Sequence, residues 1–279
     1  MADTGIADIA ATIEAVVSAM TTRTLLQNSV ALAMPGIWDR SSEVRPGMDQ
    51  LDMFVLAELA EQTVSETGVA MTPQTITPSS QSLLLNQHKS IPFSITKRAS
   101  LQSKIQLVSR TVENGVRTLA AGLDDFVLAE GVANAKTSDV TAASDGLDAI
   151  RRAGKQFDED NVPKEGRSIA ASPGFIYDLL LANNNVIRAN EYGSSEPLKK
   201  ASIVSIYGFD IFESSSSSLA DDGFLASGME SIAFARQRAV EFEQQEQVLN
   251  QKTDYTITHL YGAQTTAATN PRLYEYNPA

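Results

Sequence analysis

The sequence predicts an α+β fold. Apolar residues at helical spacing run for about 30 residues from Leu101, and the last quarter of the chain alternates polar and apolar residues as strands do. The two kinds of segment do not follow one another regularly along the chain. A doubly wound parallel sheet requires strict β-α-β alternation, so the sequence favours the α+β class.

The chain begins with an Ala-rich stretch, residues 6–33. Its apolar side chains recur at helical spacing, which predicts a short amphipathic helix; they are Ile6, Ile9, Ile13, Val16, Val17 and Met20. Pro35 and Gly36 then end any helix.

Residues 45–98 are rich in Pro, Gly, Ser, Thr and Gln. Short alternating pieces at residues 82–86 and 93–96 predict extended strands. Such strands have few means of burying both faces, so we expect a long arm rather than part of a core. A loop of about 50 residues is unusual in a compact domain unless it has a function of its own.

The helical pattern from Leu101 is the strongest signal in the chain. A helix of about 30 residues would be about 45 Å long and spine-like. Its apolar residues form one stripe with charged residues mostly off it, so we expect the helix to lie on a sheet. The stripe consists of Leu101, Ile105, Val108, Val112, Val116, Leu119, Leu123, Phe126 and Val127.

The middle of the chain mixes short helices and strands. Apolar spacing at Leu147, Ile150 and Phe157 predicts a second helix, which Pro163 follows. Residues 167–171 predict a buried strand, and Pro173 suits the first turn of a third helix.

Strand patterns dominate the rest of the sequence. Residues 203–212 predict two strand pieces joined at Gly208, and the five serines 214–218 predict a flexible loop. Further strands are expected at residues 224–226, 231–235, 239–242, 255–260 and 273–276.

Composition excludes several classes of protein. The chain has no cysteine, which excludes disulfides, thiolate metal sites and cysteine nucleophiles. A net charge of −12 has the wrong sign for tight nucleic-acid binding. The first ten residues lack the pattern of a signal peptide and no stretch is long enough to span a membrane, so we expect a soluble intracellular product without a membrane partner.

Candidate catalytic residues are few. The two histidines, His88 in the arm and His259 in a strand, are expected to be ordinary surface or half-buried residues. Gly154-Lys155-Gln156 resembles part of a phosphate-binding loop, but position 149 is Ala and position 156 is not Ser or Thr, so we reject it. We therefore predict no catalytic residue and no cofactor.

Acidic clusters are the remaining candidates for a metal site. They are Asp124-Asp125, Asp158-Glu159-Asp160 and Asp221-Asp222. Each is expected to be a solvated helix end or turn, because charge runs are usually surface features. An EF-hand is excluded because Val162 and Pro163 stand where a ligand and a glycine belong. We predict no metal ligand.

Several local sequences resemble those of one family, the major capsid proteins of tailed bacteriophages with the Hong Kong 97 fold. The most specific is the stretch 157–167, Phe-Asp-Glu-Asp-Asn-Val-Pro-Lys-Glu-Gly-Arg, followed by Pro173. Residues 207–214, Tyr-Gly-Phe-Asp-Ile-Phe-Glu-Ser, and 260–263, Leu-Tyr-Gly-Ala, resemble two strands of the family. Residues 83–95 resemble the returning strand of its extended loop, and residues 120–128 the end of its spine helix.

This resemblance implies a division of the chain. Residues 1–44 would form an N-terminal arm, 45–98 an extended β-rich loop and 99–135 the spine helix of a peripheral domain. Residues 136–226 would form an axial domain, and 227–279 peripheral-domain strands with the C-terminal segment. Leu83, Leu85, Phe93 and Ile95 of the arm would then be buried only on a neighbouring subunit.

The resemblance also implies a structural function rather than an enzymatic one. The chain would assemble into hexamers and pentamers of an icosahedral shell around double-stranded DNA, without binding a particular DNA sequence. Its partners would be further copies of itself, a portal, a separate scaffolding protein and possibly a decoration protein. The protein would be made in the host cytoplasm and reside in the virion capsid.

Two other functions stay open at this point. An encapsulin-like compartment shares the fold but encloses enzymes, although its typical N-terminal motif is not evident. A metal-dependent hydrolase would have to use the acidic clusters. Some relatives join subunits through a Lys–Asn isopeptide bond; Lys89 and Lys97 are the arm's lysines, and no partner for them is identifiable.

Overall fold

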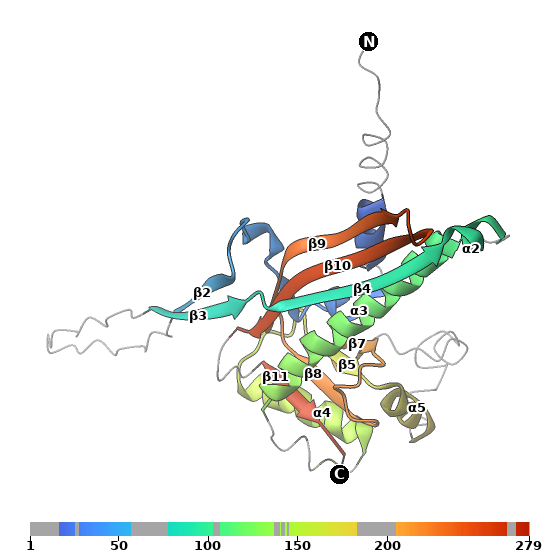
Figure 1. The fold of residues 1–279 in the computed structure, drawn as a ribbon. Coiled ribbons are helices and arrows are strands. Elements are labelled where there is room, and N and C mark those ends of the chain that lie inside the picture. Colours follow the sequence, from blue (N-terminus) through green and yellow to red (C-terminus); the bar gives the residue numbers. More distant parts are fainter. Residues whose placement is uncertain are drawn as a thin grey trace, which may run out of the picture.

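The computed structural model describes residues 17–25, 28–56, 78–102, 107–136, 140, 143, 145–182, 205–266 and 272–278. Its strands form two sheets and a projecting hairpin (Figure 1). The four-stranded sheet has the order β1-β9-β10-β4, with β1 Ile37–Asp39, β9 Ile232–Gln247, β10 Lys252–Thr265 and β4 Gln87–Thr96. The five-stranded sheet has the order β11-β8-β5-β7-β6. The mixture of helices with largely antiparallel sheets confirms the α+β class.

The spine helix α3, Leu107–Ala133, crosses one face of the four-stranded sheet (Figure 1). Its 27 residues span about 40 Å. The predicted apolar stripe is the face that it buries, since Val116, Leu119, Leu123 and Val127 are at most 6 % exposed. A short helix, α2 Lys97–Gln102, includes the start of the expected long helix, and residues 103–106 between α2 and α3 lie outside the described residues.

Near its end, α3 contacts both sheets. A Cβ at Gly131 would lie 2.6 Å from a methyl carbon of Leu225 in the five-stranded sheet and 2.8 Å from one of Ile232 in β9. Only a glycine permits this approach without displacing one of those side chains. The end of the spine helix therefore fixes the two sheets relative to each other.

Strands β9 and β10 form one long antiparallel hairpin, with Ile232 opposite Thr265 and Gln247 opposite Lys252. The sequence predicted two separate pieces for β9, at residues 231–235 and 239–242, and that division is wrong. The residues between them are only partly buried or exposed, which weakens the strand pattern in the sequence without ending the strand.

The arm differs from its expectation. Its first part forms the hairpin β2 Gln50–Leu56 and β3 Pro78–Leu84, but β4 pairs with β10 along its full length. Leu83 and Leu85, expected to be exposed until assembly, are 0 % and 6 % exposed and pack with Ala233 and Ala235 of β9. Phe93 is half-buried and stacks on Tyr255, with 5.1 Å between ring centroids. The prediction that these residues depend on a neighbour for burial is wrong.

The second unit is built on the five-stranded sheet. It contains α4 Gly146–Glu159, β5 Ser168–Ala171, α5 Pro173–Ala182, β6 Ser205–Ile206, β7 Phe209–Glu213, β8 Phe224–Ser227 and β11 Leu273–Tyr276. Phe157, Phe175, Phe209, Phe224 and Tyr274 fill its core. The predicted helices at 147–157 and after Pro173, and the strand at 167–171, are confirmed apart from one residue at the strand's start. Strand β11 pairs with β8, so the end of the chain lies in this sheet and not with β9 and β10.

The N-terminal segment packs on the long hairpin. Residues 17–25 are helical, and the hydroxyl of Ser18 accepts a 3.0 Å hydrogen bond from the Phe242 amide of β9. Two short 3-10 helices, η1 Ala31–Ala33 and η2 Ser41–Glu43, flank β1. The expected helical residues 6–16 lie outside the described residues. In the described part of the chain, no helix combines the length and apolar character needed to cross a membrane.

Candidate assembly site

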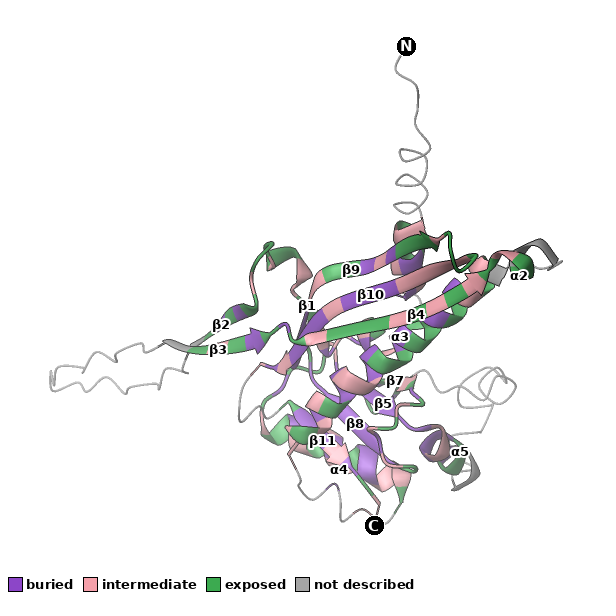
Figure 2. Ribbon diagram, in the orientation of Figure 1, coloured by how far each residue is buried: buried purple, intermediate pink, exposed green. Residues whose placement is uncertain are grey.

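The β2–β3 hairpin projects beyond the body of the molecule and has two unlike faces (Figures 1 and 2). Leu51 and Met53 point to one face and are buried at the hairpin base, together with Leu83. Phe54 and Leu84 point to the other face and are 76 % and 51 % exposed. This face of the hairpin therefore presents two large apolar side chains to solvent.

The base of the hairpin is held by a close backbone approach. A Cβ at Gly262 would lie 2.0 Å from the Leu84 carbonyl oxygen, so only glycine fits where β10 passes under β3. Tyr261 beside it is 1 % exposed and contacts Phe126 of α3 edge to face. Tyr261 and Gly262 therefore fix the point at which the hairpin leaves the sheet.

The stretch 157–167 consists of the end of α4 and the loop after it, which Arg167 closes. This side chain is 3 % exposed; it donates to Asp158 at 2.8 Å and to the carbonyl oxygens of Val162 and Pro163. Its guanidinium also lies 5.3 Å from the centre of the Phe157 ring. Asn161 and Gly166 turn the loop with φ of 54° and 73°. Sequence inspection gave Arg167 no role, because its partners are mostly backbone oxygens that no motif reveals.

The Asp124-Asp125 pair joins two distant segments to the spine helix. Asp124 is 6 % exposed and accepts hydrogen bonds from the Ser29 hydroxyl and from the amides of Val30 and Ala31. Burial raises the pKa of the Asp124 carboxyl, although these hydrogen bonds favour its charged form. The expectation of a solvated helix end is wrong for Asp124, because a segment more than ninety residues away covers it.

Asp125 holds the serine run. Its side chain accepts from the Ser216 hydroxyl at 2.6 Å and the Ser217 amide at 2.9 Å, and its carbonyl oxygen accepts from the Ser218 hydroxyl. The expected flexible loop is thus wrong: each of these serines has a defined hydrogen bond to α3.

The other acidic residues also serve the fold. Asp160 accepts from the Tyr274 hydroxyl and lies 3.5 Å from the Lys136 ammonium, while Glu159 pairs with Lys155. The backbone oxygen of Asp221 accepts from the Ser172 hydroxyl. In the part of the chain that the structure describes, no three acidic or histidine side chains gather as a metal site.

The two histidines differ in burial. His88 is exposed on β4. His259 is 1 % exposed, its ring centroid lies 4.8 Å from that of Tyr261, and its Nδ1 has no hydrogen-bond partner among the described residues. Burial, aided by the charge of Arg236, lowers the pKa of His259 to about 4. The prediction of a surface or half-buried residue is wrong for His259.

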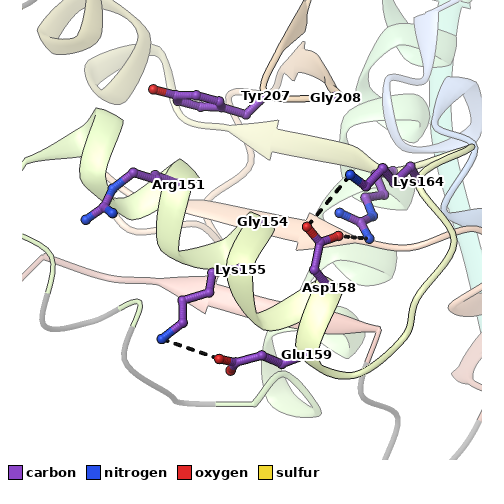
Figure 3. A pocket seen from close by; sticks show the side chains of 9 residues that line it. Arg151, Gly154, Lys155, Asp158, Glu159, Lys164, Tyr207 and Gly208 are labelled. Carbon is purple, nitrogen blue, oxygen red and sulfur yellow. Dashed lines mark hydrogen bonds and ion pairs between the residues drawn. The ribbon is translucent and has the colours of Figure 1, made fainter.

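A cavity of about 590 Å³ opens beside α4 (Figure 3). It is lined by Arg151, Gly154, Lys155, Asp158, Glu159, Lys164, Arg167, Tyr207 and Gly208. Gly154 and Lys155, rejected above as a phosphate-binding loop, lie inside α4 and not in a loop before a helix. Tyr207 and Gly208 form the turn between β6 and β7, as the sequence predicted for Gly208, and both have positive φ, 50° and 82°.

Comparisons with known proteins show which structures this arrangement resembles. No protein-family model matches the chain, and neither does any curated protein. A structure of Mycobacterium phage Che8 matches with a TM-score of 0.68 at 21 % identity, covering 82 % of this chain and 85 % of that one. The capsid of cyanophage P-SCSP1u matches with a TM-score of 0.70 at 16 % identity, covering 88 % and 86 %.

The chain has a phage capsid fold. The capsid of cyanophage Pam1 supports this further, with a TM-score of 0.63 at 12 % identity over 88 % of this chain and 91 % of that one. The expected fold of the Hong Kong 97 type is thereby confirmed. Within this capsid fold, the motifs at 157–167, 207–214 and 260–263 occupy places where the backbone turns or comes close to another strand, whereas residues 120–128 lie inside α3.

Proposed function

We propose that the chain is the major capsid protein of a tailed bacteriophage, a structural protein without catalytic function. It assembles into hexamers and pentamers of an icosahedral shell that encloses double-stranded DNA in the virion. The observation that carries the proposal is the extent of the match: phage capsid structures cover 82–90 % of this chain, and this chain covers 85–91 % of theirs. Nearly the whole chain is thus accounted for by shell architecture.

The division of the fold is part of the proposal. The four-stranded sheet with α3 forms the peripheral domain, and the five-stranded sheet with α4 and α5 forms the axial domain around the capsomer axes. The proposed boundaries differ from those expected from the sequence in two respects. Strands β1 and β4, expected in the N-terminal arm and the extended loop, belong with the peripheral sheet, and residues 272–278 belong with the axial sheet because β11 pairs with β8. One apolar cluster lies wholly within the axial domain, whereas the cluster around α3 also includes Ala170, Leu219, Leu225 and Leu273 of the axial domain.

The hairpin provides the contact between subunits. Its buried face anchors it to its own sheet, while Phe54 and Leu84 are available to a neighbour. A net charge of −12 on each subunit disfavours tight binding of the shell to the packaged DNA. A portal, a separate scaffolding protein and a decoration protein complete the set of proposed partners, and synthesis takes place in the host cytoplasm.

Electron microscopy of the expressed chain tests this function. We expect negative-stain images of uniform polyhedral shells, because phage capsid structures match this chain over most of its length. Particles that hold a protein cargo and no nucleic acid would instead indicate an enzyme compartment. A chain that stays monomeric at high concentration, alone and with a scaffolding protein from the same genome, would contradict the proposal.

A further inference from the structure

The cavity beside α4 carries a surplus of positive charge. Asp158 is shared by two cations, with Arg167 at 2.8 Å and Lys164 at 3.9 Å from its carboxylate (Figure 3). Asp148, at the start of the same helix, is likewise shared by Arg151 and Arg152. The residues that line the cavity include four cations, Arg151, Lys155, Lys164 and Arg167, but only two carboxylates, Asp158 and Glu159. The rim therefore keeps a net positive charge in a chain that is otherwise strongly acidic.

The cations at the rim are accessible. The side chains of Arg151 and Lys164 are 64 % and 80 % exposed. Exposed ion pairs contribute little to folding, so these cations remain available to a second carboxylate. The rim is therefore suited to an acidic ligand.

Tyr207 adds an unusual feature to the rim. It is 58 % exposed and has φ of 50°, a backbone region that bulky residues rarely adopt. Its aromatic ring stands over the cavity beside α4 (Figure 3). Gly208 next to it has no atom within 4 Å of where a Cβ would lie, so a partner can approach the backbone there. A two-residue hairpin turn requires positive φ at this position, where Asn would suit better than Tyr, so the turn places an exposed aromatic ring at the rim at a cost in backbone strain.

An acidic turn lies at the opposite end of the axial sheet. Asp221 and Asp222 are exposed, and no ion pair between described residues involves them. A 3.0 Å hydrogen bond from the Gly223 amide to the Ala220 carbonyl oxygen closes the turn. The Gly223 carbonyl accepts from the Ser172 amide, just after β5, whereas Arg167 at the cavity lies just before β5. A strand of four residues separates the two sites by about 13 Å.

We propose that the cavity beside α4 receives the Asp221-Asp222 turn of a second copy of this chain. This inference rests on the proposed shell function and names the residues that join neighbours in a ring. A basic site and an acidic site at different ends of one subunit can make a head-to-tail contact, and such contacts generate rings of identical subunits when the rotation between neighbours closes. Lys164 and Arg151 pair with the two incoming carboxylates, and the ring of Tyr207 covers the turn.

Charge reversal and its compensation test the contact. The full-length variants Lys164→Glu, Asp222→Lys and the double variant are expressed alongside the wild type, and rings are counted by native mass spectrometry at about 0.1 M salt. Each single reversal lowers the yield of rings by about tenfold or more, and the double variant returns it to within about threefold of the wild type. Matched controls are Arg110→Glu, Glu113→Lys and their combination on the exposed face of α3, which change net charge equally.

The outcomes separate this inference from the proposed function. If the wild type forms no rings or shells, the proposed function fails and this inference fails with it. If the wild type assembles and Lys164→Glu also gives normal rings, only the inference is overturned. The same holds if the double variant is folded by circular dichroism but its yield of rings is not restored. Single reversals that leave rings intact but reduce retained DNA would overturn it in favour of a phosphate site. Wild-type rings should also dissociate as salt is raised, which needs no variant.

Discussion

Arg167 is the residue on which the axial loop depends. Its buried guanidinium donates to Asp158 and to two backbone carbonyls. Replacing it with methionine keeps much of its volume but leaves those oxygens without a donor. We expect Arg167→Met to lower the free energy of unfolding by about 3 kcal/mol.

Denaturant unfolding measures this loss. The control is Arg238→Met, because Arg238 is 49 % exposed and pairs with Glu241 on the surface. We expect that variant to change the free energy of unfolding by less than about 1 kcal/mol. Equal losses in the two variants would mean that burial of Arg167 does not hold the loop.

His259 gives the folded chain a dependence on pH. The folded state binds a proton at His259 only near pH 4, whereas the unfolded chain does so near the ordinary value of 6.5. The unfolded state therefore binds more protons between these values, so stability is present above about pH 6.5 and is lost as the pH falls toward 4. Between pH 7 and pH 5 this loss amounts to about 2 kcal/mol.

The variant His259→Leu removes this contribution. Between pH 7 and pH 5, the free energy of unfolding of this variant should fall by about 2 kcal/mol less than that of the wild type. The other histidine supplies the control, His88→Leu, because His88 is exposed on β4. A wild type and a His259→Leu variant with parallel pH dependence would refute the buried, neutral histidine.

At the scale of elements, the β2–β3 hairpin separates folding from assembly. Met53 is 4 % exposed and packs at the base, whereas the adjacent Phe54 is 76 % exposed. We expect Phe54→Ser to leave the free energy of unfolding within about 0.5 kcal/mol but to reduce shell formation. Met53→Ser should destabilise the subunit itself by about 2 kcal/mol or more.

Unfolding curves and particle yield, measured on both variants, distinguish the two faces. The informative comparison is between neighbours of similar size and apolar character on one strand. Normal shells from Phe54→Ser would show that the exposed face of the hairpin has no role between subunits.

The elements that the sequence predicted well are those with local patterns. The stripe from Val108 to Val127 predicted α3, and Pro173 marked the start of α5. Gly208 marked the turn between β6 and β7. Each of these depends on residues a few positions apart, so periodicity or a single special residue is enough.

The errors came from long-range partners. Asp124 is covered by the segment at Ser29, and Asp125 holds the serine run through Ser216. In both cases the partners are more than ninety residues apart in the sequence. Strand β4 pairs with β10, which lies more than 150 residues later in the chain. Local sequence patterns around β4 do not reveal so distant a partner. The cavity beside α4 joins residues of α4, its following loop and the β6–β7 turn, and no local motif reveals such a grouping.

For the whole molecule, the central claim is that the subunit is stable alone but complete only in a shell. Its two sheets have filled apolar clusters, and the spine helix contacts both. Three features stay exposed at the periphery: one face of the hairpin, the basic rim beside α4 and the acidic turn at residues 221–222. These features are distributed around the subunit, as a closed shell requires.

A cryo-electron microscopy reconstruction of particles formed by the full-length chain tests this claim most directly. We expect a closed icosahedral shell in which Phe54 and Leu84 of each hairpin are buried on a neighbouring subunit, while Leu51 and Met53 stay buried on their own subunit. An absence of closed particles, or a shell in which the hairpin leaves Phe54 exposed to solvent, would contradict it.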